Sequence, residues 1–132
     1  MRAEDVPAVH ELSNATFEDL SRRRNEEPEP AEDPAGSHIR LRHLLATDPG
    51  GCWVADDEDG EPAGVAIALV REGVWGLSLL VVRPDRQSTG LGRALLDRAL
   101  AYADGARGGI ILASPDPRAL RVYARAGPAR RG

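Results

Sequence analysis

The chain has 132 residues with a formal net charge of -4, of which 42% are hydrophobic and 29% charged. That balance is typical of one soluble globular domain and unlike that of a disordered chain. All positive side chains are arginine. The negative surplus argues against a nucleic-acid partner, since proteins that bind a phosphate backbone usually carry excess positive charge. Cys52 is the single cysteine, so neither an intrachain disulfide nor a cysteine zinc cluster is possible.

Nothing in the sequence predicts a membrane segment or a leader. The most apolar stretch, residues 74–82, is far too short to span a bilayer. Residues 1–12 alternate charged and apolar side chains and lack the apolar stretch of a signal peptide. Together with the lone cysteine, this composition leads us to expect a cytoplasmic protein with no membrane partner.

The first half of the chain predicts two helices joined by a loop. A helix is expected over residues 5–20, because side chains of suitable size recur on one helical face: Val6, Val9, Leu12 and Thr16. Residues 21–36 have no periodicity and many prolines and acids, so they predict a flexible loop. Its three arginines favour nucleic-acid binding only weakly, because acidic residues follow directly and cancel most of their field. A shorter helix is expected around residues 39–45.

The second half predicts a sheet interrupted by a helix. Apolar runs at 52–55, 63–70 and 75–82 are separated by short turns, which is typical of an antiparallel meander. From Gly90 to about residue 104 the apolar residues recur at helical spacing. The run at 110–113 predicts a further strand, parallel to the third because a right-handed crossover joins them. The expected fold class is therefore α/β: a mixed, mainly antiparallel sheet with helices on both faces.

The turn between the third strand and the next helix predicts an anion site. Pro84 ends the strand, and Gln87-Ser88-Thr89-Gly90-Leu91-Gly92 leads into the helix. Glycine permits positive φ and close approach of a ligand to the backbone. The first amides of a helix have no internal acceptor and point outward at the positive end of its dipole. The hydroxyl groups of Ser88 and Thr89 could add donors, and Arg86 and Arg93 could add charge.

Two common phosphate motifs do not match this turn. A dinucleotide fingerprint needs a third glycine where the chain has Leu95, and a P-loop needs a lysine, which the sequence lacks. An ordinary strand-to-helix turn, with glycines serving geometry alone, is the simpler alternative.

Gln-x-x-Gly-x-Gly after a strand ending in Val-x-Pro resembles the acetyl-CoA-binding motif of the GNAT acetyltransferase superfamily. A second resemblance lies in residues 116–128, where Ala119, Tyr123 and Gly127 match the family pattern Asn-x-x-Ala-x-x-Leu-Tyr-x-x-x-Gly-Phe. Residues 4–9 also look like the opening helix of the family. The resemblance therefore covers nearly the whole chain.

The resemblance implies acetyl-CoA as the acyl donor, with no metal. Gln87 would open the loop, and backbone amides around residues 88–93 would bind the pyrophosphate. The preceding strand would pair with the pantetheine arm, and a bulge there would splay it from the parallel strand at 110–113. The implied cofactor-binding residues are Leu80, Val81, Val82, Gln87, Ser88, Thr89, Gly90, Leu91, Gly92 and Arg93. The Val82 amide would polarise the thioester carbonyl.

The resemblance also implies catalytic chemistry on an amine. Tyr123 would protonate the departing thiolate, a role that suits a neutral phenol; packing of this ring in the core is the alternative. Glu72, Ser78 and His43 are of the types that could serve as general base, although none has a supporting motif. The implied function is transfer of an acetyl group to the primary amine of a small molecule or peptide.

The sequence departs from the family pattern at its ends. Asp116 and Pro128 replace the usual Asn and Phe. The first strand and the last two strands of the family have little or no counterpart. We therefore expect one GNAT-like domain over residues 1–132 that is truncated at both ends. Missing strands would expose a sheet edge, so the alternative function is a non-catalytic acyl-CoA-binding or pairing domain in a homodimer or tandem protein.

Overall fold

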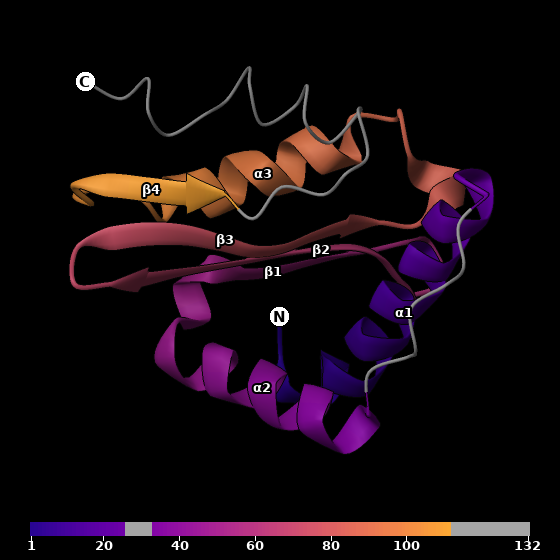
Figure 1. Cartoon of the computed structure of the whole chain (residues 1–132), viewed down its shortest axis with the longest axis horizontal. Helices are drawn as coiled ribbons and strands as arrows, with labels where there is room; N and C mark the ends of the chain where they lie inside the picture. Colours follow the sequence, from indigo (N-terminus) through magenta and orange to yellow (C-terminus); the bar gives the residue numbers. More distant parts are fainter. Residues whose placement is uncertain (26–32, 112–132) are drawn as a thin grey trace.

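The computed structural model describes residues 1–25 and 33–111 of the chain. These residues form three layers (Figure 1). One helix, α3 (Leu91–Ala101), covers one face of the sheet, and α1 (Val6–Arg23) and α2 (Pro34–Thr47) cover the other. The predicted fold class, a mixed sheet between helices, is confirmed.

The sheet contains β1 (Cys52–Asp56), β2 (Pro62–Arg71), β3 (Val74–Val82) and β4 (Gly108–Ile111), in that order. The first two pairings are antiparallel, and β3 pairs with β4 in parallel. The predicted meander and the predicted crossover through α3 are both confirmed. The crossover is needed because parallel strands cannot be joined by a tight turn.

The helices extend further than the sequence predicts. α1 continues to Arg23, where Arg22 and Arg23 both pair with Asp19 one turn earlier. α2 begins at Pro34, a residue whose fixed φ suits the first helical position. The predicted loop over 21–36 is therefore too long at both ends. Residues 26–32 and the family-like segment at 116–128 lie outside the described residues.

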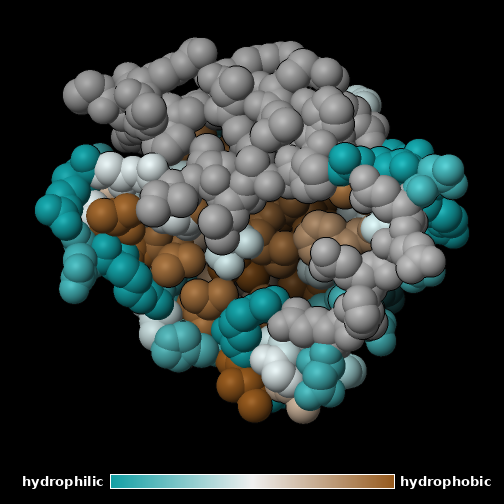
Figure 2. Space-filling model, viewed as in Figure 1, coloured by the Kyte–Doolittle hydropathy of each residue, from teal (hydrophilic) through white to brown (hydrophobic). Residues whose placement is uncertain are grey.

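Two apolar clusters hold the layers together. The α3 side is built on Trp75, Leu77 and Leu96, and the indole nitrogen of Trp75 donates to the Ala99 carbonyl of α3 at 2.9 Å. The α1 and α2 side is built on Val6, Val9 and Ile67, among others. Figure 2 shows apolar side chains gathered across the middle of the visible face, with hydrophilic residues toward its margins. Burial of both sheet faces explains why β2 is an almost continuous apolar run.

A β-bulge in β3 changes which face its side chains occupy. Ile67 pairs with Leu79 and Ala68 with Leu77, so Ser78 is the extra residue. Leu77 packs in the α3 cluster, whereas Leu79 packs against the α1 and α2 cluster, although only two positions separate them. A regular strand would put both on one face. The bulge also coincides with the last described pairing to β4, Leu77 with Ile111.

The sequence predicts no membrane-spanning segment, and the described helices bear on that prediction. Within the described ranges, the helices are too short or too polar to cross a bilayer.

Candidate functional site

The loop between β3 and α3 curls through two left-handed residues. After β3, a 3-10 turn at Pro84–Arg86 is closed by the Arg86 amide, which donates to the Arg83 carbonyl at 2.8 Å. Ser88 then has φ 65° and Gly90 has φ 91°. A left-handed conformation costs a residue with a Cβ atom roughly 1–2 kcal/mol, and glycine avoids that cost. Gly90 is therefore suited to its position, and Ser88 carries strain in the middle of the candidate site.

A row of backbone amides faces outward at the start of α3. The first hydrogen bond of this helix runs from the Ala94 amide to the Gly90 carbonyl, at 3.0 Å. Among the described residues, no hydrogen bond of good geometry runs from the amides of residues 88–93 to a carbonyl or carboxylate oxygen. These donors and the positive end of the helix dipole form an arrangement that favours an anion.

Gln87 connects this loop to two other elements. Its amide nitrogen donates to the Val82 carbonyl at 3.0 Å, and its amide oxygen accepts from Arg23 Nη1 at 3.2 Å. Gln87 thus bridges the last residue of β3 and the final turn of α1. The family resemblance implied that Gln87 opens the loop, but the contact with Arg23, 64 positions away, could not be found from spacing.

The end of β3 presents backbone groups on the side away from β2. The Arg83 amide donates to the Ala63 carbonyl at 2.8 Å, so residues 83 and 81 exchange bonds with β2. Antiparallel pairing alternates, which turns the peptide groups of Leu80 and Val82 the other way. The described part of β4 does not reach them. Leu80 and Val82 therefore fit the prediction of a strand edge that pairs with a ligand, but Val81 does not, because its peptide groups face β2.

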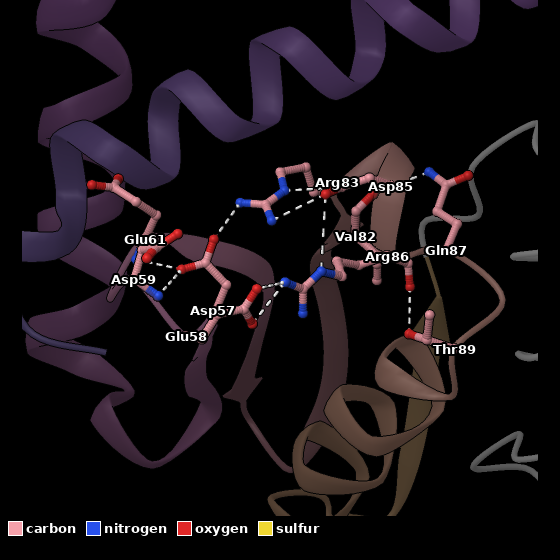
Figure 3. A network of polar contacts seen from close by, with 10 residues as sticks. All are labelled: Asp57, Glu58, Asp59, Glu61, Val82, Arg83, Asp85, Arg86, Gln87 and Thr89. Atoms are coloured by element: carbon pink, nitrogen blue, oxygen red, sulfur yellow. Dashed lines mark hydrogen bonds and ion pairs between the residues drawn. The ribbon is translucent and has the colours of Figure 1, made fainter.

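The arginines near the loop point elsewhere than expected. Figure 3 shows Arg83 and Arg86 directed toward the β1–β2 turn. Arg86 Nη2 lies 2.7 and 2.9 Å from the two carboxylate oxygens of Glu58, and Arg83 Nη1 lies 2.9 Å from Asp57 Oδ2. Arg93 pairs with Asp97 on α3 at 3.0 Å. The prediction that Arg86 supplies charge to the bound anion is not supported by this geometry.

The hydroxyl group of Thr89 also has a partner in the protein. It donates to the Arg86 carbonyl at 2.5 Å. This bond closes the loop on itself, so Thr89 contributes to loop shape.

These ion pairs keep the groups around the loop charged. The Glu61 amide and Arg83 lower the pKa of Asp57, and Arg86 lowers that of Glu58. Hydrogen bonds to Asp85 and Asp57 raise the pKa of Arg83. The sequence predicted only a solvated acidic turn here. Its role as partner of the loop arginines was missed because the pairs join residues 26 and 28 positions apart.

The structure separates the remaining candidate residues. Glu72 lies in the β2–β3 turn, so the length of β3, about 25 Å at ~3.3 Å per residue, separates it from the loop. His43 is exposed on α2, and Ser78 is the bulged residue of β3. Tyr123 lies outside the described residues. Burial raises the pKa of the Cys52 thiol to about 11, so it is not a nucleophile at neutral pH.

No group of His, Cys, Asp and Glu side chains in the described ranges is arranged to hold a metal ion.

Comparisons with known proteins agree on one family. A family model described as the acetyltransferase (GNAT) family matches residues 7–127. Mycothiol acetyltransferase of Clavibacter michiganensis subsp. michiganensis is 43% identical over 68 residues, which are 50% of this chain and 22% of that protein. The matching segment thus spans less than a quarter of that curated relative.

Solved structures show the same fold. The ribosomal-protein-alanine N-acetyltransferase of Brucella melitensis matches with a TM-score of 0.73 and 21% identity over 96% of this chain and 80% of its own. A GNAT family acetyltransferase of the same organism, in complex with acetyl-CoA, matches with a TM-score of 0.64 and 23% identity over 96% and 78% of the two chains. Because the family model extends from residue 7 to residue 127 and the fold agrees, the chain belongs to the GNAT family of acetyltransferases.

Proposed function

We propose that the chain binds acetyl-CoA at the β3–α3 loop and transfers its acetyl group to a primary amine. Family membership supports the transferase class. The observation that carries the cofactor assignment is the row of outward-facing amides at residues 88–93. A neighbouring structure of the same family contains acetyl-CoA, which supports the choice of donor.

The residues of the loop and strand fit the two polar parts of this cofactor. The amides of residues 88–93 would bind the pyrophosphate, because they are donors in need of acceptors at a positive helix end. The backbone edge at Leu80 and Val82 would pair with the amides of the pantetheine arm, as a strand does. That edge adjoins the loop directly, so one extended ligand can reach both.

The chemistry requires little from the protein beyond orientation. Acetyl-CoA, when bound, supplies an acetyl group already activated as a thioester. The strand edge and the loop would hold this group beside the acceptor amine, and proximity then accounts for much of the rate. A backbone amide of this strand edge would donate to the carbonyl oxygen, where negative charge develops. As the amine nitrogen forms its bond to the acetyl carbon and the carbon–sulfur bond breaks, Tyr123 would protonate the departing sulfur, and the proton lost by the amine would pass to water. Residues 80 and 82 thus serve binding and electrophile activation.

The loop assignment can be tested by calorimetric titration with acetyl-CoA. Gly90 and Gly105 flank α3 with φ 91° and 85°, and a Cβ atom at either one meets nothing within 4 Å. Valine is therefore similarly strained at both positions, but only Gly90→Val disturbs the proposed site. We expect Gly90→Val to abolish saturable binding and Gly105→Val to retain it. Equal affinity of the two variants, measured below their melting temperatures, would refute the assignment.

Turnover separates the enzyme from its non-catalytic alternative. Release of free CoA thiol is followed with a panel of small amines and peptides, and we expect at least one acceptor. Replacing Tyr123 with Phe should lower turnover more than affinity. Saturable binding without turnover of any primary amine would favour the acyl-CoA-binding domain instead.

A further inference from the structure

We infer that the β1–β2 turn is a positioning element of the cofactor loop, and that Asp57 is its principal residue. This inference rests on the proposed function, since it assigns a role in presenting the amides of residues 88–93. The turn contacts the loop through two ion pairs, Asp57 with Arg83 and Glu58 with Arg86 (Figure 3). Asp57 and Glu58 are both far in sequence from the amides of residues 88–93, and neither belongs to a recognised sequence motif.

The two oxygens of the Asp57 carboxylate have separate tasks. Oδ1 accepts from the amides of Asp59 and Glu61, at 2.9 and 3.0 Å, and so fixes the conformation of the turn. Oδ2 accepts from Arg83 Nη1 at 2.9 Å. The side chain of Asp57 is only 7% exposed. A shielded carboxylate with three donors is well ordered, and charge-assisted bonds of this kind are stronger than neutral ones.

Arg83 transmits this order to the loop. Its amide bonds the Ala63 carbonyl of β2 and its carbonyl accepts from the Arg86 amide, so it joins the sheet to the 3-10 turn. Its guanidinium also bonds Asp85 within that turn, at 2.6 Å from Nε. One side chain therefore links Asp57, the strand end and the turn that leads to Ser88.

The two ion pairs differ in solvent exposure, and this difference predicts which of them contributes more to loop geometry. The Glu58 side chain is 74% exposed, and exposed pairs contribute little because water and salt screen them. The shielded Asp57–Arg83 pair should therefore matter more. Both guanidinium groups point toward the turn and away from Gln87 and Thr89 (Figure 3). Their effect on a bound anion is thus through loop geometry.

The turn provides two pairs of matched variants. Asp57→Asn and Asp59→Asn make the same change, as do Glu58→Gln and Glu61→Gln, and each removes one negative charge from the same turn. Asp59 and Glu61 contact Asp57 through their backbone amides, which these substitutions leave in place. The Asp57→Asn variant keeps an oxygen that can accept from the amides of Asp59 and Glu61, but it loses the negative charge that pairs with Arg83.

The test is the affinity for acetyl-CoA, measured by calorimetry below the melting temperature of every variant. The direction in which each substitution changes this affinity decides the inference. We expect about tenfold weaker binding for Asp57→Asn and about twofold for Glu58→Gln, since a tenfold change corresponds to ~1.4 kcal/mol, within the range of one charged hydrogen bond. Asp59→Asn and Glu61→Gln should bind as well as wild type or slightly better. Mere removal of negative charge near an anion would instead strengthen binding in all four.

A double variant and hydrogen exchange exclude a purely structural effect. If Asp57 acts through Arg83, Asp57→Asn with Arg83→Gln should bind no more weakly than the worse single variant. The Arg86 amide, bonded to the Arg83 carbonyl, should exchange faster in Asp57→Asn than in Asp59→Asn without ligand. If Asp57→Asn and Asp59→Asn bind acetyl-CoA with equal affinity while the wild type binds normally, the inference is overturned. Failure of wild type to bind acetyl-CoA overturns the proposed function itself.

Discussion

The two ends of the sheet are each held by an aspartate whose side chain is largely shielded, and the comparison separates what holds the fold from what shapes the site. Asp48 lies where β1 begins and β2 ends, and Asp57 lies where β1 ends and β2 begins. Their side chains are 3% and 7% exposed, and each pairs with one arginine. The chemistry of the two ends is therefore nearly the same.

The partners of Asp48 belong to regular elements. Its carboxylate accepts from the Thr47 hydroxyl, the Val70 amide, Arg71 Nη1 and the Tyr102 hydroxyl, at 2.7, 3.1, 2.6 and 2.9 Å. Burial by itself would raise the pKa of Asp48, but these four bonds outweigh it and lower the pKa to about 2. The network joins the end of α2, the end of β2 and the end of α3.

The partners of Asp57 lead instead to the loop that carries the free amides. Equivalent chemistry at opposite ends of one sheet should thus have different consequences. Loss of Asp48 should reduce the stability of the whole domain, and loss of Asp57 should reduce affinity for the cofactor. The following predictions test that difference, from the largest expected effect to the smallest.

Replacing Asp48 with Ala should destabilise the domain by about 3 kcal/mol, because it leaves partly buried donors without an acceptor and half-exposed Arg71 without its carboxylate partner. The melting temperature should fall by roughly 10 °C. At a temperature where the variant remains folded, affinity for acetyl-CoA should stay within about twofold of wild type. An affinity loss as large as that of Asp57→Asn would remove the distinction between the two ends.

Acid should reduce the stabilisation that ionised Asp48 contributes at its end of the sheet. The folded-state pKa of about 2 lies below the ordinary value of 3.8 for an aspartate, so the folded form binds fewer protons than the unfolded form. The stabilisation is complete above pH ~4 and is lost as pH falls toward 2, by roughly 2 kcal/mol. Urea titrations between pH 2 and 5 measure this slope. Asp48→Asn should show a shallower slope, and a parallel one would contradict the assignment.

Arg23→Ala should have the smallest effect, a loss of about twofold to threefold in acetyl-CoA affinity, since one exposed hydrogen bond to Gln87 is removed. Arg22→Ala is the matched control: Arg22 pairs with the same Asp19 but is 70% exposed. The two variants should melt at similar temperatures. Equal affinities for the pair would mean that the end of α1 does not influence the loop.

Much of the fold followed from local pattern. Apolar runs bounded by turns predicted the four described strands, although β4 begins at Gly108, two residues before the predicted start. The 3.6-residue periodicity predicted the three α-helices, and the crossover rule predicted that β4 is parallel to β3. The helix ends were less predictable. Arg22 and Arg23 extend α1 through pairs with Asp19, and charged residues of that kind are equally typical of a loop.

His10 illustrates a contact that periodicity cannot supply. In the structure it is buried, with Nδ1 2.7 Å from the Ser37 hydroxyl oxygen of α2 and Nε2 3.0 Å from the Asn14 side-chain nitrogen. With the Asn14 amide donating, Nε2 is the acceptor and Nδ1 carries the proton. The pairing of α1 with α2 decided this, across 27 positions.

The sequence by itself determined where the candidate site lies in the fold and that its donors are backbone amides, because glycine spacing and a strand-to-helix junction are local properties of the chain. Only the tertiary structure decided what shapes the site: Arg86 turned toward Glu58, Arg83 toward Asp57, and Gln87 held by Arg23. Those contacts join residues 26 to 64 positions apart. Their geometry depends on how the sheet and helices pack, and sequence spacing carries no record of that.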